Sequence, residues 1–259
     1  MAESGKGGRV MDKPTWVFSC GMYRTASTTH YEMTRDIVEL TGNGVGIGYH
    51  QEKKLHEFDA PTTHRYVVCK VFEFLPGGFR DEHSHGEVIR RERRLKACAT
   101  IRDPRDIIVS MRERHRRQME DPARQAVPFD FKHRAEEEFP AWLSNLHKWI
   151  GLGPSTCLLS RYEVWTNNRV EEVRRIADHL EIDLTRDQVR GIAGDYTLKA
   201  IVDRKKASRT AKEREDPWLP SIPGPLFGTS GAHKEYLSEK EENMLVRANR
   251  VWIRRYGYL

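Results

Sequence analysis

Hydroxyl-bearing residues follow the first apolar run of the chain. The run Trp16–Cys20 ends at Gly21, and the residues after Tyr23 read Arg24-Thr25-Ala26-Ser27-Thr28-Thr29. A loop of small residues between a strand and a helix exposes backbone N–H groups at a helix N-terminus, which readily bind an anion. The hydroxyls add donors, and the guanidinium group of Arg24 can bridge two oxygens. This segment predicts an anion-binding loop, and a Ser/Thr-capped helix start with an incidental arginine is the alternative.

A second group of polar residues follows another apolar run, residues 97–101. It reads Arg102-Asp103-Pro104-Arg105-Asp106-Ile107-Ile108-Val109-Ser110. If a strand ends there and a helix begins near Pro104, Arg102 lies at the carboxyl edge of the sheet, and Ser110 lies about two turns into the helix. A guanidinium and a hydroxyl so placed can hold one phosphate. We interpret Asp103 as the helix cap, and Asp103, Arg105 and Asp106 as a surface ion pair.

The loop after Gly21 lacks the GxxxxGK[ST] pattern that binds a nucleotide triphosphate together with magnesium. We therefore expect no metal requirement, although a nucleotide kinase-like phosphotransferase stays open as an alternative. A basic polyanion-binding module is an alternative from another class, because residues 90–96 and 112–117 are rich in arginine. It does not explain the spacing of Arg102 and Ser110.

Strands and helices are expected to alternate along the chain, which predicts an α/β fold with a central parallel sheet flanked by helices. Short apolar runs predict strands, whereas apolar stripes at helical spacing predict helices. The expected strands are residues 16–20, 45–47, 65–72, 97–101 and 156–159, and the expected helices are residues 31–40, 133–150, 170–180, 186–200 and 238–255. Ser238 and Glu241 match a capping box.

The domain boundaries follow from composition. Residues 1–13 are glycine-rich and polar and are expected to be disordered, so a single domain is expected over residues 14–259. Residues 203–233 are rich in Lys, Arg, Pro and Gly and are interpreted as a mobile loop.

The composition predicts a cytoplasmic protein. Lys and Arg outnumber Asp and Glu, 44 to 38, which suits an anionic ligand but is weak evidence for nucleic acid. No apolar stretch has the length of a signal-peptide core or a membrane span. The four cysteines have no metal-ligand spacing and are expected to be reduced. We therefore expect neither a membrane nor a nucleic-acid partner.

The two polar motifs resemble those of the sulfotransferase superfamily. Arg24-Thr25-Ala26-Ser27-Thr28 is similar to its 5′-phosphosulfate loop, and Arg102 to Ser110 is similar to its 3′-phosphate motif, R-D-P-R-D-x-x-x-S. Arg161-Tyr162-Glu163 resembles the strand end that precedes a helix in this family. Gly228-Thr229-Ser230-Gly231-Ala232-His233-Lys234 resembles the Gly-x-x-Gly-x-x-Lys segment that folds over the nucleotide.

The resemblance implies a nucleotide-kinase-like fold and the co-substrate 3′-phosphoadenosine 5′-phosphosulfate (PAPS). Residues 24–29 would hold the 5′-phosphosulfate, with Arg24 stabilising the leaving phosphate. Arg102 and Ser110 would bind the 3′-phosphate, and Tyr162 would contact the adenine. Lys70 would point at the sulfuryl group. Gly228, Gly231 and Lys234 would complete the nucleotide site.

Three departures from the family pattern affect these expectations. Ala26 replaces a glycine, which is tolerable if its φ stays below zero. Leu226-Phe227 replaces an Arg-Lys pair, and Arg209, Lys212 or Arg214 would have to substitute. Phe72 stands where many members carry the catalytic histidine.

Because Phe72 cannot take a proton, the base must come from elsewhere. The candidates are His50, Glu52 and Glu73, and we rank His50 first because of its unperturbed pKa. The acceptor is expected to be a small molecule with a hydroxyl or an amine or amide nitrogen, and a role in microbial secondary metabolism is our hypothesis. Trp142, Trp149, Trp165 and Trp218 are expected in the core, and Trp218, in the expected mobile loop, is also a candidate to line a pocket.

Overall fold

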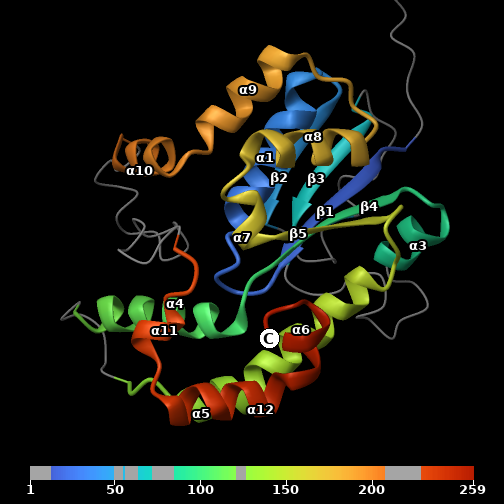
Figure 1. Ribbon diagram of the computed structural model, residues 1–259. Coiled ribbons are helices and arrows are strands. Elements are labelled where there is room, and N and C mark those ends of the chain that lie inside the picture. Colours follow the sequence, from blue (N-terminus) through green and yellow to red (C-terminus); the bar gives the residue numbers. More distant parts are fainter. Residues whose placement is uncertain (1–12, 50–54, 56–63, 72–84, 121–126, 208–228) are drawn as a thin grey trace, which may run out of the picture.

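The computed structural model describes residues 13–49, 55, 64–71, 85–120, 127–207 and 229–259. The described part of the chain contains strands and helices in alternation, as the sequence predicts (Figure 1). In chain order they are β1 Thr15–Gly21, α1 Ser27–Leu40, β2 Gly44–Tyr49, β3 Tyr66–Lys70, α3 His85–Arg91, β4 Leu95–Ile101, α4 Pro104–Met119, α5 Phe131–His133, α6 Phe139–Ile150, β5 Cys157–Arg161, α7 Tyr162–Trp165, α8 Arg169–His179, α9 Arg186–Asp195, α10 Leu198–Ala207, α11 His233–Tyr236 and α12 Glu239–Arg255.

The five strands form one parallel sheet in the order β2-β3-β1-β4-β5. This confirms the α/β fold class and the central parallel sheet. The chain leaves β1 toward one edge of the sheet, through β2 and β3, and then crosses to β4 on the other side of β1. Ligands of open α/β sheets bind outside the carboxyl ends of the strands at such a reversal of strand order. Here that point lies between Gly21 and Ile101.

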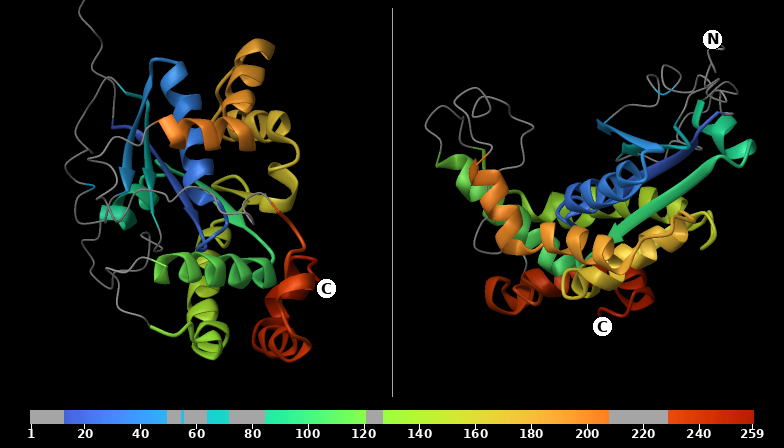
Figure 2. Two further views of the ribbon diagram at one scale, coloured as in Figure 1. Left: turned by 90° about the vertical axis from the view of Figure 1, so that its left-hand side faces the viewer. Right: turned by 90° about the horizontal axis from the view of Figure 1, so that it is seen from above.

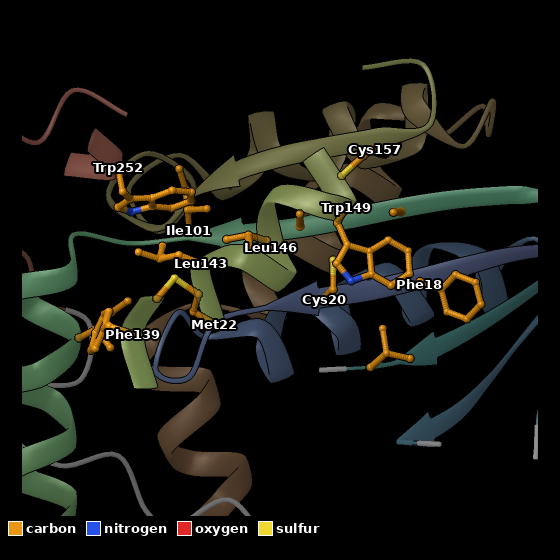
Figure 3. Packing of buried hydrophobic residues seen from close by; sticks show 14 of the residues in the cluster. Phe18, Cys20, Met22, Ile101, Phe139, Leu143, Leu146, Trp149, Cys157 and Trp252 are labelled. Atoms are coloured by element: carbon orange, nitrogen blue, oxygen red, sulfur yellow. The ribbon is translucent and has the colours of Figure 1, made fainter. Parts of the chain in front are cut away.

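Alternating side chains of β1 enter two different cores. Trp16, Phe18 and Cys20 face the layer that contains α6 and α12, whereas Val17 faces the layer that contains α1, α8 and α9. The two layers lie on opposite faces of the sheet (Figures 1 and 2). On the first face, Trp149 of α6 packs against Phe18, with ring centroids 5.5 Å apart (Figure 3). Both faces are covered, which is why the strands read as continuous apolar runs.

Two helix starts occur where the sequence predicts them. The side chain of Asp103 accepts a hydrogen bond from the backbone N–H of Arg105 at 2.9 Å, and Pro104 is the first residue of α4. At the start of α12, Ser238 and Glu241 form a complete capping box. Local sequence is enough to specify these starts, because the cap and its partner are only two or three residues apart.

Two expected helices differ from the structure. Residues 133–150 are not a uniform α-helix, because a π-helical turn, Arg134–Glu138, precedes α6 and Pro140 falls in the first turn of α6. Residues 186–200 are divided between α9 and α10. Helix α10 runs to Ala207, so the assignment of residues 203–207 to a mobile loop is wrong; alanine, lysine and arginine favour helix there. The rest of that predicted loop, up to residue 228, lies outside the described residues, as does Trp218.

Candidate active site

The loop between β1 and α1 is anchored to β4. A Cβ atom on Gly21 would lie 2.2 Å from the hydroxyl oxygen of Thr100, so only glycine fits there. The hydroxyl of Thr25 donates to the carbonyl of Met22 at 2.8 Å and lies 2.8 Å from the hydroxyl of Thr100. Thr25 is buried, and its hydroxyl is therefore committed to the protein. We expected this hydroxyl to be a ligand donor; its role in the structure is to hold the loop.

Two residues of this loop have a left-handed backbone. Arg24 has a φ of 63° and Ala26 a φ of 57°. The expectation that Ala26 keeps a negative φ is wrong. The left-handed conformation costs a residue with a Cβ atom about 1–2 kcal/mol, and the surrounding contacts of the loop must offset that cost.

Helix α1 begins immediately after Ala26 and leaves its N-terminus open to a ligand. Ala26 supplies no side-chain cap, and the first turn contains no acidic residue. Its N–H groups and helix dipole therefore favour an anion. The ammonium group of Lys70, at the end of β3, donates a hydrogen bond to the hydroxyl of Thr28 in this first turn. The structure thus brings Lys70 to the loop, as the sequence predicts, while Ser27 and Thr29 are buried.

Arg102 holds three segments together at the carboxyl end of β4. Its guanidinium group donates to the carbonyl of Arg24 at 3.1 Å and to the carbonyl of Thr229 at 2.7 Å. The guanidinium carbon also lies 4.2 Å from the centre of the Tyr162 ring. The face of the Tyr162 ring therefore helps to position Arg102, and the sequence motif did not indicate this contact.

One donor of Arg102 has no hydrogen-bond partner in the described part of the chain. The residue is buried, with 3% of its surface exposed, and its Nε atom makes no hydrogen bond to a described residue. Among the described residues, Arg102 also forms no ion pair. A buried, unpaired guanidinium donor is costly, and an anionic ligand oxygen would satisfy it. The residues present therefore fit a bound phosphate.

Arg24 and Ser110 are joined directly. The Nε atom of Arg24 donates to the hydroxyl oxygen of Ser110 at 3.0 Å, which links the two motifs that the sequence placed in one site. Burial, followed by the positive charges of Arg114, Arg102 and Arg117, lowers the pKa of Arg24 to about 10. A side chain among like charges is prepared to receive a negative ligand.

The C-terminal segment docks on the first turns of α4 through Asp106. Its carboxylate accepts hydrogen bonds from the backbone N–H groups of Gly231 and His233, at 2.7 and 3.0 Å. The Nδ1 atom of His233 lies 2.9 Å from the same carboxylate. Asp106 is only 1% exposed, so its interpretation as part of a surface ion pair is wrong.

The other two residues of that expected ion pair do contact each other. Arg105 and Asp103 are paired at 2.8 Å, mostly buried, and Arg105 also donates to Glu242 and to the carbonyl of Tyr258. No local sequence pattern indicates these partners, because they lie far along the chain. Lys234 is exposed on α11, and nothing described in the structure joins it to the arginines.

Several expected site residues lie outside the described part of the chain. These are His50, Glu52, Glu73 and Gly228, together with Phe72, Arg209, Lys212 and Arg214. The strand that precedes His50 is described: β2 pairs in parallel with β3, and Tyr49 is the partner of Lys70. This confirms the expectation that the strand near residues 45–47 lies beside the strand of Lys70.

A pocket lies on the other side of the loop, against α6. The rings of Tyr23 and Trp142 stack with their centroids 5.2 Å apart. Trp142 is half-buried and lines the pocket, whereas Trp149 and Trp165 are buried as expected. Figure 3 shows Met22, Leu146 and Trp149 within the buried apolar cluster. The lining residues are Gly21, Met22, Tyr23, Trp142, Asn145, Leu146 and Trp149.

The family model for a sulfotransferase domain matches residues 81–251, which is more than half of the chain. The chain belongs to the sulfotransferase family. This sulfotransferase has no match among curated proteins. Neither the kinase nor the polyanion-binding alternative gains support from the family match.

Two solved structures show a similar fold. Retinol dehydratase in complex with androsterone and the inactive cofactor PAP is 15% identical, with a TM-score of 0.63; the match covers 94% of this chain and 82% of that chain. Mouse sulfotransferase SULT7A1 complexed with PAP is 13% identical, with a TM-score of 0.65. The match covers 96% of this chain and 89% of that chain. These structures confirm the fold of the sulfotransferase. In the described part of the chain, no helix is long and apolar enough to cross a bilayer.

Proposed function

We propose that this sulfotransferase moves the sulfuryl group of PAPS to a hydroxyl, or to an amine or amide nitrogen, of a small molecule. Family membership supports sulfuryl transfer. The fold neighbours carry PAP, the product of PAPS after transfer. The observation that carries the proposal is the unpaired Nε donor of buried Arg102, close to the linked Arg24 and Ser110 at the switch point of the sheet.

Each site residue predicted for the nucleotide then has a proposed role. Arg102 and Ser110 hold the 3′-phosphate, and the N–H groups at the start of α1 hold the 5′-phosphosulfate. When bound, PAPS supplies a sulfur whose bond to the phosphate oxygen breaks as the acceptor atom attaches. Lys70 and Arg24 stabilise the negative charge that develops on that oxygen. Tyr162 is retained as the adenine contact, and Gly228, Gly231 and Lys234 as the cover of the nucleotide.

The base is proposed to come from the segment that follows β2. Tyr49 ends β2 as the partner of Lys70, which supports a base from the residues that follow Tyr49, with His50 ranked first and Glu52 and Glu73 as alternatives. Replacing His50 with Ala should lower kcat by about 10²–10⁴-fold, the range for general-base catalysis, and leave PAP affinity unchanged. A fully active His50→Ala enzyme would transfer the role to Glu52 or Glu73, which the corresponding Gln variants would then separate.

The acceptor is proposed to enter the pocket beside Tyr23. Two stacked aromatic rings with one amide, from Asn145, suit a flat, largely apolar molecule with a polar group. The androsterone and retinol of the fold neighbours are of this kind. Trp142→Ala should therefore raise the acceptor KM and leave the PAP affinity unchanged. A cytoplasmic location, a role in secondary metabolism and activity without metal remain further proposals, which localisation and chelator assays would test.

The proposal is tested by transfer of labelled sulfate from PAPS to a panel of hydroxyl and amine acceptors. Lys70→Ala should lower kcat much more than it lowers PAP affinity, because Lys70 acts on charge formed in the transition state. Lys96→Ala is the matched control: it removes a strand lysine that donates to the carbonyl of Ser155. No transfer to any acceptor, together with equal affinity for PAP and 5′-AMP, would contradict the proposal.

A further inference from the structure

Helix α4 carries a basic residue, Arg114, on the same face as Ser110. Ser110, Arg114 and Arg117 are spaced four and three residues apart, so they lie on one face of the helix. Side chains on a helix lean toward its N-terminus and cover the preceding turn. The side chain of Arg114 is therefore directed toward the turn that contains Ser110, whose hydroxyl contacts Arg24.

The electrostatic effect on Arg24 supports this placement. Burial is the largest cause of the lowered pKa of Arg24, and Arg114 is the largest cause among the charged groups, ahead of Arg102. Arg102 is itself bonded to the backbone carbonyl of Arg24. The positive charges of Arg114 and Arg102 therefore both act on Arg24, whose Nε atom contacts the hydroxyl of Ser110.

Among the described residues, Arg114 differs from the other arginines of α4 in having no carboxylate partner. Arg112 is paired with Glu241, Arg116 with Glu113 and Glu120, and Arg117 with Glu113. Within the described residues, Arg114 forms no ion pair and no hydrogen bond, although it is half-buried. Like charges gathered without a carboxylate repel one another, and an anion placed between them removes that repulsion.

We propose that Arg114 is a nucleotide-binding residue, which reaches the same 3′-phosphate as Arg102 and Ser110. The inference rests on the proposed function, because it assigns a further contact to the proposed donor. A terminal phosphate has three oxygens and accepts several charge-assisted hydrogen bonds, so it can satisfy Arg102 and Arg114 together. Arg114 thereby supplies a cation that the segment at Leu226-Phe227 does not.

The test compares PAP with 5′-AMP, which lacks the 3′-phosphate, by calorimetry on the full chain. Arg114→Gln should weaken PAP binding by about 10–100-fold, as expected for a lost charge-assisted hydrogen bond, and leave 5′-AMP binding unchanged. The affinity of the variant for PAP should also fall less steeply with added salt. Arg116→Gln is the matched control: Arg116 is on the same helix but exposed and paired, and neither affinity should change.

Three results would overturn the inference. Arg114→Gln could weaken PAP and 5′-AMP equally, which would indicate a structural effect. It could leave PAP affinity intact and raise only the acceptor KM, which would assign Arg114 to an acidic acceptor. Wild-type protein that binds PAP no better than 5′-AMP would overturn the proposed function as well. If Arg114→Gln lowers the unfolding midpoint, Arg114→Lys provides the second test, and it should restore most of the PAP affinity.

Discussion

The residues of the loop after β1 combine backbone strain with gathered positive charge. Arg24 and Ala26 both have a left-handed backbone, and Arg24 is partly buried among arginines. Neither feature favours the folded state by itself. Residues that bind and react often carry such a cost, which the rest of the fold offsets. The strain and the charge can be tested separately.

Replacing Ala26 with Gly should stabilise the protein. Glycine adopts a φ of 57° without the steric cost of a Cβ atom, so we expect a gain of about 1 kcal/mol, or roughly 2–4 °C in the unfolding midpoint. Ala141→Gly is the control: Ala141 is exposed on helix α6, where glycine should cost about 1 kcal/mol. Equal destabilisation by the two changes would mean that residue 26 is not left-handed.

Replacing Arg24 with Gln should stabilise the nucleotide-free protein and impair catalysis. The folded state lowers the pKa of Arg24 to about 10, so the charged form is less favourable there than in the unfolded chain. That cost is fully present at neutral pH and disappears only as the pH rises above the lowered pKa. Arg102→Gln should instead destabilise the protein, because it loses two bonds to carbonyls. Thermal unfolding at pH 7 without nucleotide measures the stability of both variants. A lower unfolding midpoint for Arg24→Gln than for the wild type would contradict the expected stabilisation.

At the scale of elements, helix α4 organises the C-terminal part of the site. Its first turns hold Gly231 and His233 through Asp106, and Arg112 donates to the carbonyl of Tyr236. Arg102, immediately before the helix, contacts the carbonyl of Thr229. One helix thus carries Ser110, which is proposed to bind the 3′-phosphate, and the anchor of the segment proposed to cover the nucleotide.

Replacing Asp106 with Asn should release that segment. Burial by itself would raise the pKa of Asp106, but the N–H groups of Gly231 and His233, the His233 side chain and Arg102 hold it below its ordinary value. The ionised carboxylate therefore stabilises the fold at pH values above its ordinary pKa, and this contribution is lost as the pH falls through the lowered pKa. An amide oxygen cannot accept all three hydrogen bonds, and a buried unpaired group costs about 1–3 kcal/mol.

In the Asp106→Asn variant, the free energy of unfolding measured in urea and the affinity for PAP should both be lower than in the wild type. Asp178→Asn, at an exposed position of α8, should change stability by less than about 0.5 kcal/mol. Stability of Asp106→Asn equal to that of the wild type would show that the segment is held by other contacts.

At the scale of the whole molecule, the order of strands creates the binding crevice. Strands β1 and β4 are neighbours in the sheet, but their chain connections run in opposite directions. The loop after β1 and Arg102 after β4 therefore open onto one edge, with layers of helices on both faces (Figure 2). A ligand there contacts loop, helix and C-terminal segment at once, so its binding should stabilise the entire fold.

PAP should raise the stability of the whole chain in a concentration-dependent way. At 100 times its Kd, a ligand of the folded state adds about 2.7 kcal/mol, which corresponds to roughly 5–10 °C in the unfolding midpoint. 5′-AMP at the same concentration should give a much smaller shift, because it lacks the 3′-phosphate that Arg102 and Ser110 are proposed to bind. Equal shifts from the two nucleotides would argue against recognition of the 3′-phosphate.

The sequence by itself determined the features that depend on neighbouring residues. Apolar periodicity specified the strands and most helices, and the caps at Asp103 and Ser238 followed from residues two or three positions away. The spacing from Arg102 to Ser110 indicated a phosphate site for the same reason. These signals are local, so one chain segment carries each of them.

Only the tertiary structure decided the contacts between distant segments. Asp106 and Gly231 are 125 residues apart, and no local pattern distinguishes this buried anchor from a surface ion pair. The left-handed backbone of Ala26 accompanies a loop held against Thr100, which the loop sequence does not reveal. The pocket at Tyr23 requires Trp142 from another layer, and the convergence of Arg114 on Arg24 requires α4 to pack beside the loop. Each depends on packing across the sheet, where separation in sequence carries no information about separation in space.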